Sequence, residues 1–242
     1  MVLTVQTLAN PCEVELKIES FRNDKLRLVG YCANKEKYFD RNIDTIGSPM
    51  VFNFGCPVSP DQLFIKVESA NGRPPQVRLS HSLKPLKSDF ILNPKVREYC
   101  EFVKEFCGKY HLYPAGKRYS SSSGRFKVRH NPVIMAANGS KSITPARIHK
   151  REHYIEVSKE WFSGITIPMR AFILCHEFSH VYLNNDPLSE TEADINGAKL
   201  YLSMGFPVIE LIYSFTKVFG DNPQTHERAN NVMNYLNSIK NG

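Results

Sequence analysis

The H-E-x-x-H pattern at residues 176–180 constrains this chain more than any other feature. Residues four apart share one face of an α-helix. The run from residue 168 to 184 is apolar on nearly all sides, with Thr166 as a suitable N-cap and Pro168 in the first turn, and this predicts a buried helix. Two imidazoles would then meet beside the Glu177 carboxylate, which suits a catalytic zinc site. The alternative is a pair of hydrogen-bonded core histidines.

A second helix is expected directly after the first one. Asp186-Pro187 predicts its start, because aspartate is a favoured N-cap and proline is favoured at the first helical position. A tight connection would bring the beginning of this helix opposite the end of the histidine helix. Gly197 and Ala198 have small side chains, so they would let the two helices approach closely.

The first part of this second helix is acidic. Glu190 and Asp194 lie four residues apart and share a face, while Glu192 falls on a more polar face. We expect Glu190 to be the third metal ligand and Asp194 to orient a ligand histidine through its other ring nitrogen. Glu192 is the alternative ligand. The full set of expected metal ligands is His176, His180 and Glu190. An acidic first turn also occurs without a metal, because it suits the helix dipole.

These pieces resemble the gluzincin zinc peptidases, most closely the branch of CAAX prenyl proteases and heat-shock proteases, and the minigluzincins. In that family a helix carrying E-x-x-A-D, as at residues 190–194 here, supplies the third zinc ligand. Thr225-His226-x-Arg228 resembles the family's T-H-P-x-x-x-R-I segment. The resemblance implies that His226 lies near the substrate and steadies the transition state, and that Arg228 holds the local structure. An exposed helix start is the alternative for His226.

The resemblance implies a zinc-dependent endopeptidase, with Zn²⁺ as cofactor and a protein or peptide as substrate. Glu177 would be the catalytic base that takes a proton from water and passes it to the leaving nitrogen. The resemblance also implies an edge strand before the histidine helix, on which an extended substrate could pair. Ser179 stands where the family often has glycine, and the transmembrane helices of the relatives are absent.

Composition points to an ordinary globular protein. Of 242 residues, 42% are hydrophobic and 23% are charged, and no stretch approaches the length of a transmembrane helix. The N-terminus lacks the basic start and long apolar run of a secretory signal. The six cysteines form no C-x-x-C pattern and are interpreted as buried reduced thiols, although an even count also permits disulfides. We therefore expect a soluble, cytoplasmic protein without a membrane partner.

Positive charge is concentrated in one segment. Residues 117–151 contain nine Lys or Arg and no Asp or Glu, in a chain with a net charge of +7. The basic residues are Lys117, Arg118, Arg125, Lys127, Arg129, Lys141, Arg147, Lys150 and Arg151. Such a segment could contact nucleic acid or an acidic protein. A solvated basic face is the alternative.

The expected fold class is α+β, in two domains. Residues 1–87 show five short strands separated by turn-prone groups, which predicts a small β-sandwich or barrel acting as an interaction module for a protein partner. Residues 88–242 are expected to form a mostly helical zincin-like domain with a small sheet, including a helix that starts at Asn93-Pro94. The predicted strands are Val14–Ile18, Leu26–Tyr31, Met50–Phe54, Leu63–Val67, Gln76–Ser82, Arg125–His130 and Arg147–Val157.

Two other functions are compatible with these features. One is an assembly or virion structural protein that keeps a peptidase-like zinc domain, for example in a phage particle, with zinc serving stability. The intact Glu177 favours an enzyme over this alternative, because a structural site needs no base. The other is a protease that acts on DNA-bound proteins, suggested by the basic segment.

Overall fold

The computed structural model describes residues 1–7, 11–46, 49–86, 93–220 and 222–240, except for the side chains of residues 239 and 240. The chain divides into two compact units. The first contains residues 1–88 and 205–207, and the second contains residues 89–204 and 208–242. The boundary expected between residues 87 and 88 lies outside the described residues.

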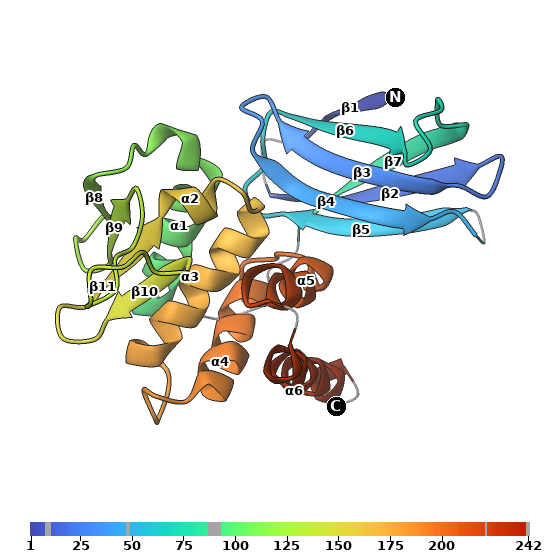
Figure 1. Ribbon diagram of the computed structural model, residues 1–242. Coiled ribbons are helices and arrows are strands. Elements are labelled where there is room, and N and C mark those ends of the chain that lie inside the picture. The colour runs from blue at the N-terminus through green and yellow to red at the C-terminus, as the bar shows by residue number, and fades with distance from the viewer. Residues whose placement is uncertain (8–10, 47–48, 87–92, 221, 241–242) are drawn as a thin grey trace. The chain divides into compact units, whose positions relative to one another are not determined.

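The first unit is made of two antiparallel sheets in two layers (Figure 1). One sheet has the strand order β1 (Val2–Gln6), β6 (Gln62–Ser69), β3 (Lys25–Cys32) and β4 (Lys37–Asp44). The other has the order β5 (Met50–Cys56), β2 (Cys12–Ser20) and β7 (Val77–Pro85). Alternate residues of β2 and β6 are fully buried, so each sheet turns one apolar face inward. Neither of these two described sheets closes into a barrel.

The expectation of five strands in this unit was wrong, because the described residues also form β1 and β4. The sequence of β4 is Lys-Tyr-Phe-Asp-Arg-Asn-Ile-Asp, which is too polar to predict a strand. It forms nonetheless because it pairs along its whole length with β3, and because Arg27 of β3 makes a two-point ion pair with Asp40 of β4. Cross-strand pairing has therefore overridden local propensity.

The second unit contains a four-stranded sheet. Its order is β10 (Ala146–His149), β11 (Tyr154–Ser158), β9 (Lys127–Asn131) and β8 (Lys117–Ser120), with only β9 and β11 parallel. The single strand expected at residues 147–157 is instead the hairpin of β10 and β11, because a turn with His153 at a φ of 53° reverses the chain. Strand β10 lies at one edge of this sheet, so its outer side has no strand partner among the four.

The helices of the second unit are α1 (Pro94–Gly108), α2 (Lys159–Phe162), α3 (Ile167–Tyr182), α4 (Glu190–Ser203), α5 (Val208–Val218) and α6 (Pro223–Lys240), with a short 3₁₀ turn at Tyr110–Leu112. Helix α3 packs against β10 and β11 of this sheet, and helices α1, α4 and α5 pack against α3 (Figure 1). The predicted start of α1 is confirmed, since the Asn93 side chain accepts a 2.9 Å hydrogen bond from the amide of Val96. The α+β class is also confirmed.

Helices α3 and α4 pack closely where Gly197 faces His176. A Cβ atom at Gly197 would lie 3.0 Å from both the Cα and the amide nitrogen of His176. This contact is with the backbone of a buried helix, which has little freedom to move away. The small side chain expected at this position therefore sets the distance between the two helices.

Replacing Gly197 with valine is expected to lower the free energy of unfolding by about 1–3 kcal/mol, because the added atoms overpack the contact. Denaturant unfolding of the metal-free protein measures this change. Gly164→Val is the matched control, since Gly164 is exposed and its nearest contact for a Cβ atom is at 3.5 Å. Equal stability of the two variants would contradict close helix packing at Gly197.

The structure also bears on the expectations for the cysteines and for membrane-spanning helices. All six cysteines are buried and free, as expected. Among the helices of the described residues, none has the length and apolar character needed to cross a membrane.

Candidate metal centre

Helix α3 carries both histidines of the H-E-x-x-H pattern. Its start is as predicted: the Thr166 side chain accepts from the amide of Met169, and Pro168 lies in the first turn. The helix is buried along most of its length, and only 3% of His176 and 6% of His180 is exposed. The apolar surroundings therefore hold both imidazoles on one side of a rigid, buried helix.

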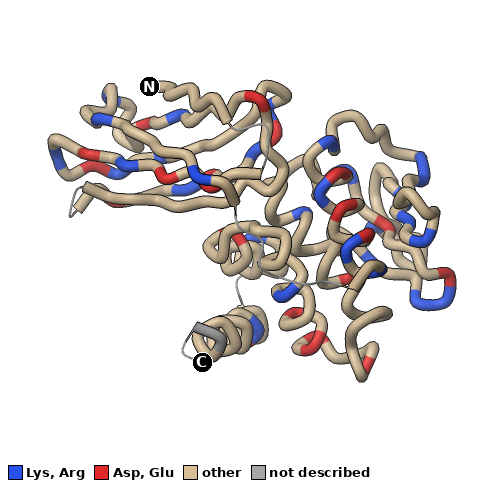
Figure 2. Tube along the Cα trace, turned by 180° about the vertical axis from the view of Figure 1, so that it is seen from behind, with Lys and Arg blue, Asp and Glu red and all other residues tan. Residues whose placement is uncertain are grey.

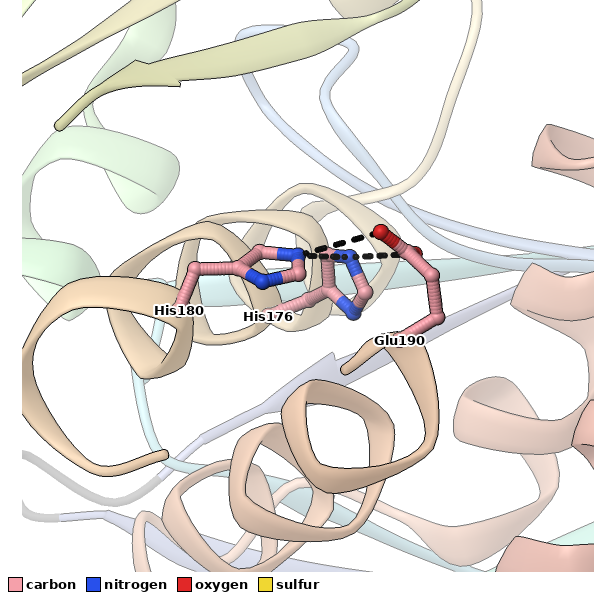
Figure 3. A group of neighbouring side chains, drawn as sticks. All are labelled: His176, His180 and Glu190. Carbon is pink, nitrogen blue, oxygen red and sulfur yellow. Dashed lines mark hydrogen bonds and ion pairs between the residues drawn. The ribbon is translucent and has the colours of Figure 1, made fainter. Parts of the chain in front are cut away.

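The two histidines meet Glu190 of α4 at one point (Figure 3). Their Nε2 atoms are 3.2 Å apart, and each lies 3.4 Å from an oxygen of the Glu190 carboxylate. One donor atom from each residue lies within 4.8 Å of the others, so the three together could hold a metal ion. Glu190 is half exposed, which leaves one side of the cluster open to solvent.

The other ring nitrogen of each histidine faces an oxygen atom of the protein. His180 donates from Nδ1 to the carbonyl oxygen of Pro187 at 3.0 Å. Nδ1 of His176 lies 2.9 Å from Oδ1 of Asp194. Contacts of this kind fix the tautomer and the ring orientation of metal-binding histidines, and they leave Nε2 as the atom available to a metal. The structure thus brings Asp194 to the place expected from the sequence.

Arg228 of α6 completes the surroundings of the cluster. It donates from Nε and Nη2 to the two oxygens of Asp194 at 2.7 and 2.8 Å, and its Nη2 lies 3.2 Å from Glu190. Asp194 is only 1% exposed, so this two-point ion pair neutralises a carboxylate that would be costly to bury alone. Arg228 connects α6 to Glu190 and Asp194 of α4.

The electrostatics of the cluster favour a positive charge at its centre. Burial disfavours the charged form of His176, but Asp194 and Glu190 outweigh this effect and raise its pKa to about 9. Burial and the neighbouring His176 lower the pKa of His180. The contact with His176 lowers the pKa of Glu190 to about 2, so that carboxylate is ionised at neutral pH. The same carboxylates that stabilise an imidazolium would stabilise a bound cation.

Glu177 lies beside the histidines but faces the sheet. Its Oε2 atom accepts a 2.8 Å hydrogen bond from the amide of Ile148 in β10. The N–H group of Ile148 therefore points away from β11, outward from the unpaired edge of the sheet. The structure thus places an edge strand next to the candidate base, where the sequence resemblance implied one.

Glu192, the alternative ligand, lies outside the cluster. Its Oε2 atom accepts hydrogen bonds from the amides of Asn185 and Asp186, at 2.8 and 3.2 Å. It therefore holds the loop between α3 and α4 and is not one of the three residues whose donor atoms converge.

The expected helix start at Asp186-Pro187 was wrong. Helix α4 begins at Glu190, with Ser189 as the N-cap that accepts from the amide of Glu192. Asp186 instead accepts from the amide of Leu188 and closes a local turn. This turn places the carbonyl group of Pro187 against His180, so the loop contributes directly to the site.

His226 lies exposed near the start of α6, two residues before Arg228. A role for it at the substrate stays a prediction. Arg228 is the residue of that segment for which the structure gives contacts to both Glu190 and Asp194.

Comparison with family models, with curated proteins and with solved structures gives no match to this chain.

Asp194→Asn is expected to weaken metal binding about 10–100-fold, the usual loss when a partner of a ligand histidine is changed. Asparagine keeps the shape of the side chain but removes the charge that faces His176 and Arg228. Isothermal titration with zinc measures the change. Asp186→Asn is the matched control, since asparagine also caps a local turn. Unchanged affinity in Asp194→Asn would contradict the orienting role.

Proposed function

We propose that this protein is a zinc-dependent endopeptidase. The observation that carries the proposal is the convergence of His176, His180 and Glu190 at one point, with Glu177 on the same helix and next to an edge strand. A purely structural site would need neither a neighbouring base nor an open side.

Zinc is the metal that best suits this donor set. Two imidazole nitrogens and one carboxylate oxygen, with space for a further ligand, are typical of catalytic zinc sites. His176, His180 and Glu190 would hold the ion, and Asp194 and Pro187 would keep the imidazoles in place. Zinc, when bound, supplies Lewis-acid polarisation of water and of a carbonyl group.

Glu177 supplies the acid–base chemistry in this proposal. It follows His176 directly in the buried helix α3, so its position relative to the cluster is fixed. Its carboxylate takes a proton from the attacking water and passes it to the leaving nitrogen of the peptide bond. Such proton transfer contributes about 10²–10⁴-fold to the rate.

Strand β10 binds the substrate in this proposal. Its outer edge is free of other strands of the sheet, and an extended peptide could pair there as a fifth strand. The amide of Ile148, now bound to Glu177, is one of the groups that a substrate carbonyl oxygen would reach. Substrate pairing would therefore compete for this amide and release the carboxylate for catalysis.

A proteolysis assay tests the proposal. Purified protein is incubated with denatured casein, with and without a zinc chelator, and metal content is measured for the wild type and for His176→Ala. We expect cleavage that the chelator removes and added zinc restores, and about one zinc ion per chain in the wild type only. Stoichiometric zinc without cleavage of casein or of a random peptide library would favour a structural role for the metal.

A further inference from the structure

The basic segment of the sequence becomes an ordered row of side chains across the small sheet. Arg118 of β8 is paired in register with Arg129 of β9. Arg129 is paired with Glu156 of β11, and Glu156 with Arg147 of β10. Residues paired in register lie on the same face of a sheet. Three arginines and one glutamate therefore cross all four strands in a single line.

This row lies on the face opposite the core of the unit. Val128, Ile155 and Val157 alternate with the row along β9 and β11, and all three are buried. The Arg129 and Arg147 side chains are 45% and 39% exposed. Lys127, two residues before Arg129, adds a further exposed positive charge to the same face. Figure 2 shows blue segments along these strands.

Glu156 organises this face but does not neutralise it. Its carboxylate is 8% exposed and lies 2.5 Å from Arg147, 2.9 Å from His149 and 3.9 Å from Arg129. The face carries this one carboxylate and four basic side chains, Arg118, Lys127, Arg129 and Arg147, so it keeps an excess of positive charge. The buried carboxylate also fixes the positions of its neighbours, which reduces the entropy lost when they bind an anion.

The face also carries flat aromatic rings. His149 stacks on Tyr154, with ring centroids 4.3 Å apart and an angle of 13° between the planes. The guanidinium of Arg118 lies 6.0 Å from the centre of the Tyr154 ring. Stacked rings among arginines suit the flat surface of a nucleobase, since bases stack on aromatic side chains and on guanidinium groups.

We propose that this sheet face binds single-stranded nucleic acid. Its positive charges meet the phosphates, and the stack of His149 and Tyr154 receives an unpaired base. An acidic protein could pair with the positive charges but has no bases to stack on the rings. The bases of a duplex are already stacked on each other and are not free to stack on the protein. The inference rests on charged and aromatic side chains outside the metal cluster, so it stands independently of the peptidase proposal.

The test is fluorescence anisotropy with a labelled single-stranded oligonucleotide of roughly 20 nucleotides. This length exceeds the site of a typical single-strand-binding fold, which covers up to about 16 nucleotides. The variant Arg118→Glu/Lys127→Glu reverses two exposed charges of the face. We expect it to bind at least about tenfold more weakly than the wild type, and to show a shallower dependence of affinity on salt, because fewer phosphates are neutralised.

The control variant Arg78→Glu/Lys84→Glu makes the same change in net charge on β7 of the first unit, where both side chains are also exposed. It should bind the oligonucleotide as the wild type does. An equal loss in this control would overturn the proposal, because net charge alone would then explain binding. A circular dichroism spectrum identical to that of the wild type confirms that each variant is folded.

The kind of anion is tested with two competitors, a duplex of the same sequence and poly-glutamate. We expect both to compete less well than the single strand, and His149→Ala to weaken binding of the single strand about fivefold through lost stacking. Equal competition by the duplex or by poly-glutamate would overturn the assignment to single strands, as would unchanged binding in His149→Ala.

Discussion

Glu177→Gln is expected to lower the rate of peptide hydrolysis by about 10²–10⁴-fold while still binding zinc. Glutamine has nearly the same shape, and its side-chain oxygen can still accept the hydrogen bond from the amide of Ile148. It cannot take up a proton, so only the acid–base step is removed. Measuring kcat/KM on a peptide substrate and zinc affinity by titration separates the two effects.

Glu160→Gln is the matched control for this variant. Glu160 is 51% exposed and pairs with Lys141 at the surface, so the same substitution should leave activity unchanged there. Wild-type activity in Glu177→Gln would remove Glu177 from the mechanism. Loss of zinc together with activity would show instead that Glu177 supports the metal site.

Glu190→Ala is expected to weaken zinc affinity by more than about 100-fold, because it removes a ligand itself. Changing a residue that only orients a ligand already weakens metal affinity by about 10–100-fold. Each oxygen of Glu190 lies 3.4 Å from the Nε2 atom of a histidine, whereas Asp194 faces Nδ1 of His176 and Glu192 accepts from loop amides. Arg228 and Asp194 remain paired in this variant, which keeps α4 and α6 together.

Glu192→Ala provides the comparison. Glu192 accepts hydrogen bonds from the loop amides of Asn185 and Asp186, so its loss should reduce stability more than zinc affinity. We expect its affinity to stay within about tenfold of the wild type, less than the loss seen for partners of ligands. The opposite ranking of the two variants would transfer the ligand assignment to Glu192.

Features of the site that depend on local sequence could be predicted. The start of α3 follows from Thr166 and Pro168, and its burial follows from an apolar run without a polar face. The shared face of His176 and His180, and of Glu190 and Asp194, follows from helix periodicity alone. Helix periodicity predicts which side chains share a face of one helix, and it does not depend on contacts with the rest of the chain.

Features that depend on distant contacts could not be derived in this way. The two-point contact of Arg228 with Asp194 joins residues 34 positions apart, and only the family resemblance singled out Arg228. Strand β4 depends on its pairing with β3 and not on its own polar sequence. Asp186-Pro187 has the local marks of a helix start, yet the loop donates a hydrogen bond to Glu192 and accepts one from His180, and these contacts favour a turn.

The hydrogen bond between Glu177 and Ile148 has a consequence for solubility. An exposed strand edge offers unpaired amides to the strands of other molecules and so invites aggregation. The Glu177 carboxylate covers one such amide with a negative charge, which discourages a neighbouring chain from attaching there by chance. One side chain thus shields part of the exposed edge of β10.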